Sequence, residues 1–346
     1  MNVKARTRPA VHPGLFFTVG CILLTGCGSG HLTPASSNTP SNAGTAAIAQ
    51  QGPQMGFLWS ASEQTLRSIQ GVPGASQFGP PMLQPGQYVA AGASARSGAA
   101  ILEDKAGDVS LMSVASGQPQ PLAGVHISGT AQFVFSPSGA NAVIFVPGQN
   151  AAFLLTGLAG LEQPSPQVQV QGLASASALQ AVAVSDMAQV VGAASASGPT
   201  TLTLLTGNAA PVATLGGFGG IAFLPGGSDL LAVDSAHSVV NLIPGNGAAA
   251  QSFASSALRA PFAVAASQDG RTAVVANGGD ASVIRLDLTN AANQMRIPCS
   301  CKPDRLMPLA GNAVFALTGP GTTTAWMVDA AATVPHTLFI PAMVKE

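Results

Sequence analysis

A single residue separates Cys299 from Cys301, and this spacing suggests chemistry more directly than any other in the sequence. Side chains at i and i+2 of a strand share a face, with Cα atoms roughly 7 Å apart, near the upper limit for a disulfide. Pro298 and Pro303 predict a turn, which would shorten that distance. In an oxidising compartment we expect a disulfide here. A redox-active pair and free or intermolecular thiols remain alternatives. A metal site is disfavoured, because zinc needs about four ligands.

The histidines and carboxylates form no motif associated with catalysis. His126, His237 and His336 have no His, Asp or Glu at a spacing typical of a metal site or a proton relay, so we expect them at turns or strand ends. Glycosidases need two facing carboxylates. The Asp and Glu residues here are scattered, although a repeat fold can bring distant positions together. The sequence therefore predicts no catalytic residue, metal ligand or cofactor.

A glycine-rich run at residues 216–220 (GGFGG) has the composition of a phosphate-binding loop. No Lys-Ser or Lys-Thr follows it, and it does not open a helix. We expect a mobile loop between structural repeats instead.

The composition indicates a chain that can form a hydrophobic core, and it excludes some kinds of partner. Hydrophobic residues make up 47% of the chain, enough for a core, whereas 8% are charged, against roughly 25% in typical soluble domains. The 13 Lys and Arg residues form no basic patch, which excludes a nucleic-acid partner.

The elements that would position any site begin after an export signal. Lys4, Arg6 and Arg8 form a basic region ahead of an apolar stretch at residues 15–24. Ten helical residues span about 15 Å, half of a bilayer core, so this stretch predicts a signal peptide and not a membrane span.

Residues 24–27 (LTGC) resemble the lipobox of bacterial lipoproteins. The resemblance implies cleavage before Cys27 and attachment of lipid to its sulfur and amine. Two attachment positions anchor a protein stably where one acyl chain would be marginal. Gly28 stands where aspartate would favour the inner membrane, so we expect the outer membrane, facing the periplasm or the cell surface. The alternative is an ordinary secretory signal with a chance cysteine.

Three segments follow from these features. Residues 1–26 are the predicted signal peptide, residues 27–53 a lipidated cysteine and a Ser-, Pro- and Asn-rich tether, and residues 54–346 the folded body. The tether has almost no large apolar side chain with which to offset its ordering entropy.

The body contains a repeat of about 43 residues. Each copy has a short apolar strand, a turn of Ser-Pro-x-Gly type, a second apolar strand, a polar turn and a third alternating strand, as in residues 133–157 and 264–288. This period matches one four-stranded propeller blade of about 40–45 residues, and alternation with β-branched residues favours strands over helices. The residues that open the first turn of each copy are Ser94, Ser136, Ser185, Leu224, Ser267 and Pro308.

The blade count also needs the two ends of the body. Residues 57–69 look like the later half of a blade without its opening strand, and residues 336–343 (HTLFIPAM) like a strand without a blade. If the second completes the first, the body is an all-β, seven-bladed propeller closed by its N- and C-terminal strands. Closure would protect strand edges from solvent. Six and eight blades are the alternatives.

Residues 267–288 (SQDGRTAVVANGGDASVIRLDL) resemble the repeat of the YVTN family of bacterial seven-bladed propellers. The family positions are occupied by Ser267, Asp269, Gly270, Asn277, Val283 and Asp287, and a glutamine replaces the usual proline. The match is good in this repeat and fades in the others. It implies architecture without catalytic residues: Gly270 is expected at positive φ, and Asp269 is expected to bond turn amides.

We expect a lipid-anchored propeller of the cell envelope that binds a protein, peptide or glycan partner without catalysis. The alternative is a propeller hydrolase or lyase, similar to lactonases, with its site at the mouth of the central channel. Three or more ionisable side chains converging there would favour the enzyme.

Overall fold

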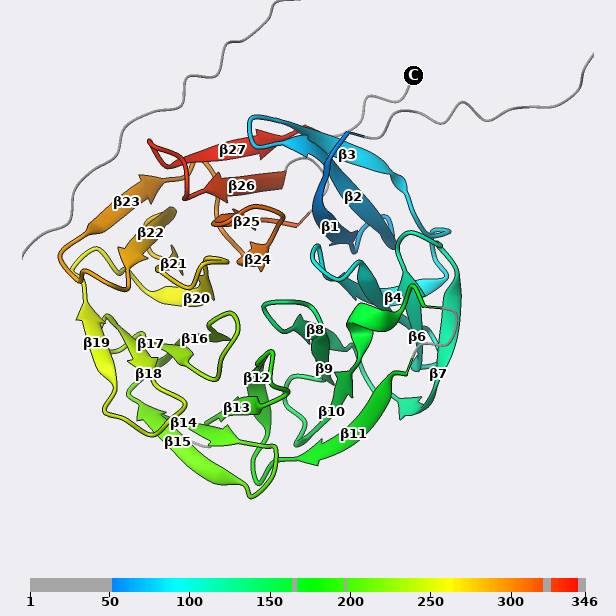
Figure 1. Ribbon diagram of the computed structural model, residues 1–346, viewed down its shortest axis with the longest axis horizontal. Helices are drawn as coiled ribbons and strands as arrows, with labels where there is room; N and C mark the ends of the chain where they lie inside the picture. Colours follow the sequence, from blue (N-terminus) through cyan, green and yellow to red (C-terminus); the bar gives the residue numbers. More distant parts are fainter. Residues whose placement is uncertain (1–51, 164–166, 196–197, 320–324, 342–346) are drawn as a thin grey trace, which may run out of the picture. The chain divides into compact units, whose positions relative to one another are not determined.

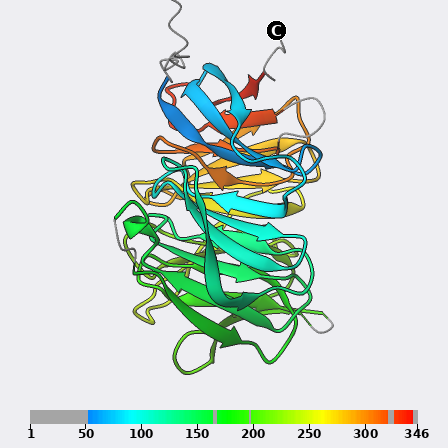
Figure 2. The same cartoon turned by 90° about the vertical axis from the view of Figure 1, so that its right-hand side faces the viewer.

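The computed structural model describes residues 52–163, 167–195, 198–319 and 325–341. These residues form seven antiparallel sheets arranged around a central axis (Figure 1). The predicted all-β, seven-bladed propeller is confirmed. Figure 2 shows the ring edge-on, with the blue and red blades at the top, the green blades at the bottom and the strands running across the view. No helix among the described residues is long and apolar enough to cross a membrane.

Consecutive strands build each blade from the axis outwards, in chain order. Blade 1 has β1 (Gln54–Ser60), β2 (Thr65–Val72) and β3 (Ala75–Pro81). Blade 2 has β4 (Tyr88–Ala93), β5 (Ala99–Asp104), β6 (Asp108–Ser113) and β7 (Pro119–His126). Blade 3 has β8 (Gln132–Phe135), β9 (Asn141–Phe145), β10 (Ala151–Thr156) and β11 (Gln169–Ala174), with the 3-10 turn η1 (Leu158–Gly160) after β10. Blade 4 has β12 (Leu179–Val184), β13 (Val190–Ala194), β14 (Thr200–Leu204) and β15 (Ala210–Leu215). Blade 5 has β16 (Phe218–Phe223), β17 (Leu230–Asp234), β18 (Val239–Ile243) and β19 (Gln251–Ala254). Blade 6 has β20 (Pro261–Ala266), β21 (Thr272–Asn277), β22 (Ser282–Asp287) and β23 (Gln294–Pro298). Blade 7 has β24 (Met307–Pro308), β25 (Val314–Ala316), β26 (Ala325–Asp329) and β27 (His336–Ile340).

The hydrophobic core lies between neighbouring blades. Every residue of β9 is buried, because both faces of this strand are covered. Ile144 packs into the core shared with blade 2, and so does Ala142, two residues before it. Val143 points the other way, into the core shared with blade 4. Side chains alternate across a strand, so a continuous apolar run is what a strand between two blades requires.

We name the segment between the first and second strands of a four-stranded blade the first turn. In blades 2 to 6 it opens at the residue that the repeat predicts, and in blade 7 at Leu309, one residue after the predicted Pro308. In blades 2, 3, 6 and 7 the N–H of the opening residue donates to the carbonyl of the residue that begins the second strand, as Ser267 does to Thr272 at 2.8 Å. In blades 4 and 5 the acceptor lies one residue before that strand, at Gln189 and Asp229. The repeat period is thus the spacing of these turns.

Blade 1 has three strands among the described residues, and β1 takes the place of a second strand. Four residues separate β1 from β2, as they separate β17 from β18 and β21 from β22. The last of the four has positive φ in each case: Gln64, Ser238 and Ala281. The β1 strand also packs against β4 of the next blade, as β17 packs against β20. The predicted absence of the opening strand is confirmed for this part of the chain.

The predicted pairing of residues 336–343 with blade 1 is wrong. The β27 strand pairs with β26 over five positions, from Ala325↔Ile340 to Asp329↔His336, and is the outermost strand of blade 7. A short turn joins these two strands, whereas pairing with β1 would need a far longer loop. Closing the shorter loop costs less chain entropy.

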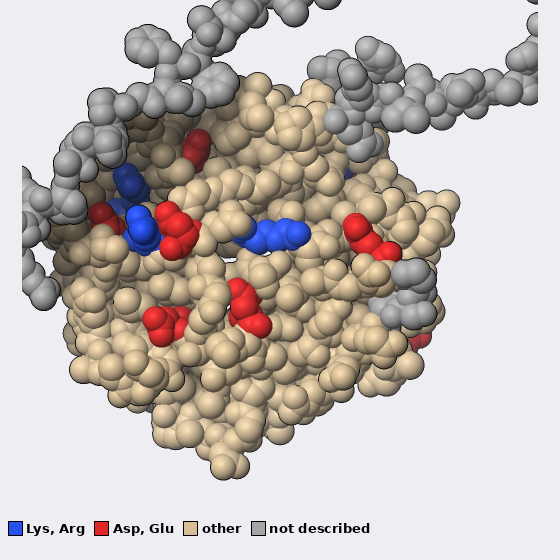
Figure 3. All heavy atoms as spheres, in the orientation of Figure 1, with Lys and Arg blue, Asp and Glu red and all other residues tan. Residues whose placement is uncertain are grey.

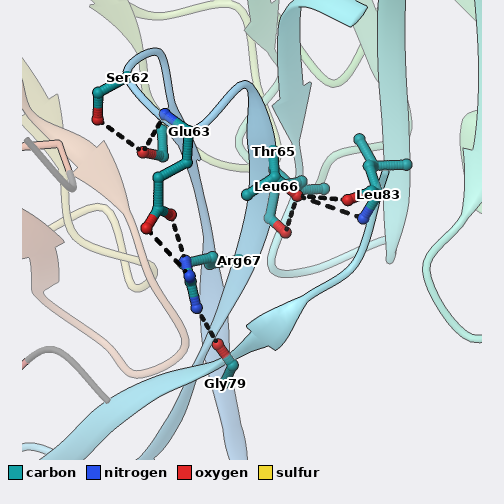
Figure 4. A network of polar contacts seen from close by, with 8 residues as sticks. Ser62, Glu63, Thr65, Leu66, Arg67, Gly79 and Leu83 are labelled. Atoms are coloured by element: carbon teal, nitrogen blue, oxygen red, sulfur yellow. Dashed lines mark hydrogen bonds and ion pairs between the residues drawn. The ribbon is translucent and has the colours of Figure 1, made fainter. Parts of the chain in front are cut away.

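Side-chain contacts hold the three strands of blade 1 together (Figure 4). The guanidinium of Arg67 donates to both carboxylate oxygens of Glu63, at 2.6 and 3.1 Å, and to the carbonyl of Gly79 at 3.0 Å. The hydroxyl of Thr65 donates to the carbonyl of Leu83 at 2.8 Å. These bonds link the turn before β2 to β3 and to the chain that follows it.

Candidate functional site

The first turns of blades 2 to 7 gather around the axis at one face of the ring and line a cavity of about 530 Å³. Figure 3 shows one face of the ring, with acidic and basic side chains close to its central opening. The residues that line the cavity are Ala95, Arg96, Pro137, Ser138, Asp186, Pro225, Gln268, Ala310 and Gly311. Two of them are ionisable, Arg96 and Asp186.

Buried serines shape these turns. The Ser94 hydroxyl accepts from the N–H groups of Arg96 and Ser97 at 3.2 Å each, and the Ser185 hydroxyl accepts from Gln189 at 3.0 Å. The Ser267 hydroxyl accepts from the N–H of Thr272 at 2.9 Å. A serine that bonds its own turn in this way favours the turn over other conformations. The repeated serines are therefore structural.

Asp186 joins three blades. One carboxylate oxygen accepts from the N–H and the hydroxyl of Ser138 in blade 3, at 2.8 and 2.6 Å. The other accepts from the N–H of Gly226 in blade 5 at 2.9 Å. Burial alone would raise the pKa of Asp186, but these hydrogen bonds outweigh it and lower the pKa. Asp186 is thus an ionised group whose oxygens hold neighbouring turns.

Arg96 is the basic group of the cavity. Its side chain is half-buried, and burial lowers its pKa, while the nearby negative charge of Asp186 opposes that shift. Arginine keeps its charge under such conditions, and its fork of N–H donors matches a carboxylate or phosphate. The cavity therefore presents a partly desolvated cation, because the acidic group beside it is engaged by Ser138 and Gly226.

The opposite end of the blades carries a second polar cluster. The Asp234 carboxylate accepts from the N–H groups of Gly216 and Gly217 at 2.8 and 3.1 Å, and lies 2.8 Å from Nδ1 of His237. Burial would raise the pKa of Asp234, but the bonds with His237 and the two glycines lower it. Gly216 and Gly217 lie in the linker between blades 4 and 5, as predicted, and Asp234 holds them there. Residues 218–220 form the start of β16, so the predicted loop is wrong for that part.

The histidines lie at turns or strand ends, as the sequence predicts: His126 ends β7, His237 lies between β17 and β18, and His336 begins β27. Two of them have acidic partners that the spacing analysis did not identify. His237 bonds Asp234, three residues before it, and Nδ1 of His126 lies 3.1 Å from Asp108 across the β6–β7 ladder. The second contact joins residues 18 apart in the chain, which no local spacing reveals. The third histidine, His336, bonds the carbonyl of Val334 at 2.7 Å.

The family positions of residues 267–288 have structural roles. Gly270 has φ +68°, and Asp269 accepts from the N–H of Arg271 at 3.0 Å, as expected. Asn277 is fully buried at the end of β21, where its oxygen accepts from the N–H of Arg259 at 3.1 Å and its amide donates to the carbonyl of Ala257 at 2.8 Å. It therefore fixes the linker that enters the blade.

The predicted cysteine pair lies in the linker before β24. The sulfur atoms of Cys299 and Cys301 are bonded, and their Cα atoms are 5.0 Å apart. Cys299 is buried, and its N–H donates to the carbonyl of Ala281 at 3.0 Å. Cys27 lies outside the described residues. No group of three or more His, Cys, Asp and Glu side chains suited to a metal occurs in the described ranges.

Neither family models nor curated proteins match this sequence. Solved structures do match it, at low sequence identity. The Cps50 (Swd1) β-propeller domain from Myceliophteria thermophila has a TM-score of 0.54 at 11% identity, over 76% of this chain and 89% of that one. A streptogramin B lyase has a TM-score of 0.53 at 13% identity, over 75% and 84%. Virginiamycin B lyase from Staphylococcus aureus has a TM-score of 0.51 at 10% identity, over 74% and 84%. These likenesses show the propeller fold alone.

Sequence reasoning missed Arg96 and Asp186 as partners, since 90 positions separate them. A signal was nevertheless present. Both follow the opening serine of a first turn, Ser94 and Ser185, by one or two residues. Aligning the turns of a closed ring places such residues at one face, so the repeat itself could have identified them.

Proposed function

We propose that this protein is a lipid-anchored propeller of the cell envelope that binds a protein, peptide or glycan partner without catalysis. The partner contacts the cavity at the first turns. An acidic group on the partner, such as a carboxylate, pairs with the guanidinium of Arg96.

One observation carries this proposal. Asp186 accepts three hydrogen bonds from blades 3 and 5, so its oxygens are occupied in holding the cavity wall. Arg96 lies in the same wall, and no hydrogen bond of its guanidinium to a described residue is found. Turns held in place by such bonds form a preorganised surface, which lowers the entropy cost of binding. Desolvation also strengthens the attraction between the guanidinium and an anion.

Capture from detergent-solubilised envelopes, followed by mass spectrometry, tests the binding role. The bait is the full chain, in wild-type form and as Arg96→Gln. The matched control is Arg259→Gln, because Arg259 lies in the linker between β19 and β20, at the opposite end of the blades. We expect partners that are retained by wild type and the control but lost by Arg96→Gln. Equal capture by all three proteins would contradict the proposed site.

The anchor needs a separate test, because Cys27 lies outside the described residues. Replacing Cys27 with Ser should prevent lipid attachment and release the protein from the membrane fraction. Mass spectrometry of the wild-type N-terminus should find acyl chains on a chain that begins at Cys27. A Cys27→Ser protein that stays with the membrane would contradict the anchor while leaving the binding proposal intact.

A hydrolase or lyase is the second candidate, and one contact favours it. The Asp234 carboxylate bonds Nδ1 of His237, whose side chain is 69% exposed, an arrangement that orients an imidazole as a general base. Assays with a panel of esters and lactones would test it. An activity lost in His237→Ala but kept in His126→Ala would support the enzyme, because both histidines bond an aspartate and differ in their surroundings.

A further inference from the structure

The outer edge of blade 3 is a long, uncharged and exposed strand edge. The β11 strand is the last of its sheet and lies at the rim of the ring, away from the axis (Figure 1). Its six residues read QVQGLA, with no charged residue and no proline. All of them except Leu173 are exposed, including the apolar side chain of Val170. An exposed strand edge of this kind is a ready template for pairing with another chain.

The other six outer strands carry features that oppose such pairing, namely proline, charge or short length. The β19 strand has four residues. The β27 strand lies between Pro335 and Pro341, and its Thr337 hydroxyl donates to a carbonyl of β23 at 3.2 Å. The prolines and the charged residue of the remaining four are Pro80 and Pro81 in β3, Pro119 and Pro121 in β7, Pro211 in β15, and Arg296 and Pro298 in β23. The β11 strand has none of these features.

The backbone groups of β11 that point outwards follow from the ladder with β10. The N–H of Ser175 donates to the carbonyl of Asn150 at 2.7 Å, one position beyond the last pair of that ladder. Bonded and non-bonded pairs alternate along antiparallel strands, so every second residue back from Ser175 also bonds β10. The residues between them, Val170, Gly172 and Ala174, direct their N–H and C=O groups to the outer edge. No described residue bonds these groups.

We propose that β11 is a contact surface between two copies of this chain, which pair edge to edge as antiparallel strands about a twofold axis at Gly172. The outward-facing residues are spaced evenly about this glycine. Gly172 of each copy therefore bonds its counterpart, and Val170 of each copy bonds Ala174 of the other. Every outward N–H of the strand then meets a C=O. Contacts in which both copies use the same patch are the usual basis of twofold dimers.

The side chains of β11 suit a second copy of the same strand. Val170, Gly172 and Ala174 share one face, because side chains alternate along a strand. Pairing about Gly172 therefore covers the exposed Val170 with an Ala174 methyl group. No charged side chain of β11 meets a like charge across the axis. At Gly172 itself a Cβ would meet no heavy atom within 4 Å, so the space beside the strand is open.

The pairing leaves the cavity at the first turns accessible. That cavity surrounds the axis, whereas β11 lies at the rim of the ring (Figure 1). A pair of chains would therefore present two cavities, each with its own Arg96. The proposal does not depend on what binds there, and the variants that test it leave Arg96 unchanged.

Disulfide cross-linking of the full chain tests the pairing and its register. Bonded pairs of antiparallel strands have Cα atoms about 5.5 Å apart, a distance that a disulfide spans. Association raises the effective concentration of the two thiols, so Gly172→Cys should form a covalent dimer at least about tenfold faster than Gln251→Cys. This control lies at the exposed start of the outer strand β19. A mixture of Val170→Cys and Ala174→Cys should also cross-link, whereas neither protein should do so alone.

Three outcomes would overturn the proposal. Equal rates for Gly172→Cys and Gln251→Cys would show that the dimers arise from random collision. Dimers of Val170→Cys alone would contradict pairing about Gly172. Capture of a different protein by Gly172→Cys, without dimers, would assign this edge to a foreign extended segment.

Lysine variants provide a second readout. Gly172→Lys, added to the Val170→Cys and Ala174→Cys proteins, places like charges opposite each other at the axis and should slow their cross-linking several-fold. Gln251→Lys should leave the rate unchanged. Because the space beside Gly172 is open, Gly172→Lys should melt close to wild type. If this variant does not fold, the cysteine variants still decide the question. An unchanged rate in a folded Gly172→Lys protein would contradict the pairing.

Discussion

Asp269 and Asn312 bond each other reciprocally across the boundary between blades 6 and 7. The N–H of Asp269 donates to Oδ1 of Asn312, and Nδ2 of Asn312 donates to Oδ2 of Asp269, both at 3.0 Å. A further bond runs from the N–H of Gln268 to the carbonyl of Asn312 at 2.6 Å. The first turns are therefore linked to one another as well as folded on themselves.

A double-mutant cycle with Asp269→Ala and Asn312→Ala should measure a coupling of about 0.5–1 kcal/mol at neutral pH, because the pair is exposed to solvent. Burial would raise the pKa of Asp269, but bonds from the Ser267 hydroxyl, the Arg271 N–H and the Asn312 amide lower it below 3.8. The folded state therefore favours the ionised form. Ionised Asp269 therefore contributes its full stabilisation above the pKa that it has in the unfolded chain. This stabilisation is lost as the pH falls through its pKa in the folded protein. Urea unfolding of the four proteins of the cycle at pH 7 and pH 3 measures this dependence. A coupling energy that increases at pH 3 would contradict the prediction.

Asn277→Ala should destabilise the protein by about 1–3 kcal/mol, since the N–H of Arg259 and the carbonyl of Ala257 lose a buried partner. Asn150→Ala, at an exposed position, should cost less than about 0.5 kcal/mol. Chemical denaturation compares the two. Equal losses of unfolding free energy in the two variants would mean that Asn277 does not hold the linker between β19 and β20 in place.

Deleting residues 336–346 should damage blade 7. The β27 strand supplies Phe339, whose ring meets that of Trp326 edge-on with centroids 5.7 Å apart. Trp59 instead packs with the core that faces blade 2. In single-tryptophan variants, truncation should therefore shift the emission of Trp326 to longer wavelength and leave that of Trp59 nearly unchanged. A shift of the Trp59 emission with that of Trp326 unchanged would instead indicate that the C-terminal strand pairs with blade 1.

Reducing the Cys299–Cys301 bond should change stability little. In the chain-entropy account a disulfide stabilises more when it closes a longer loop, and this one spans a single intervening residue. Thiol titration of the unfolded, unreduced protein should find neither cysteine free. A Cys299→Ser, Cys301→Ser double variant should melt close to wild type, and a large loss of stability would show that the bond organises the linker before β24.

The architecture of the body could be predicted from local sequence patterns. Strand alternation, turn residues such as Gly270, and the spacing of the opening serines are local properties, because each depends on a few neighbouring residues. Seven similar units with apolar faces can bury those faces only by stacking, so the local pattern was enough to predict a propeller.

The contacts between groups far apart in the chain could not be predicted in this way, because they depend on the folded ring. Local pairing placed β27 beside β26 in blade 7 and not beside β1, because the shorter loop costs less chain entropy to close. Arg96 and Asp186 line one cavity because the first turns of blades 2 and 4 lie around the same axis, and His126 meets Asp108 because β6 and β7 are paired. These contacts depend on ring geometry and strand register, which no short stretch of sequence specifies.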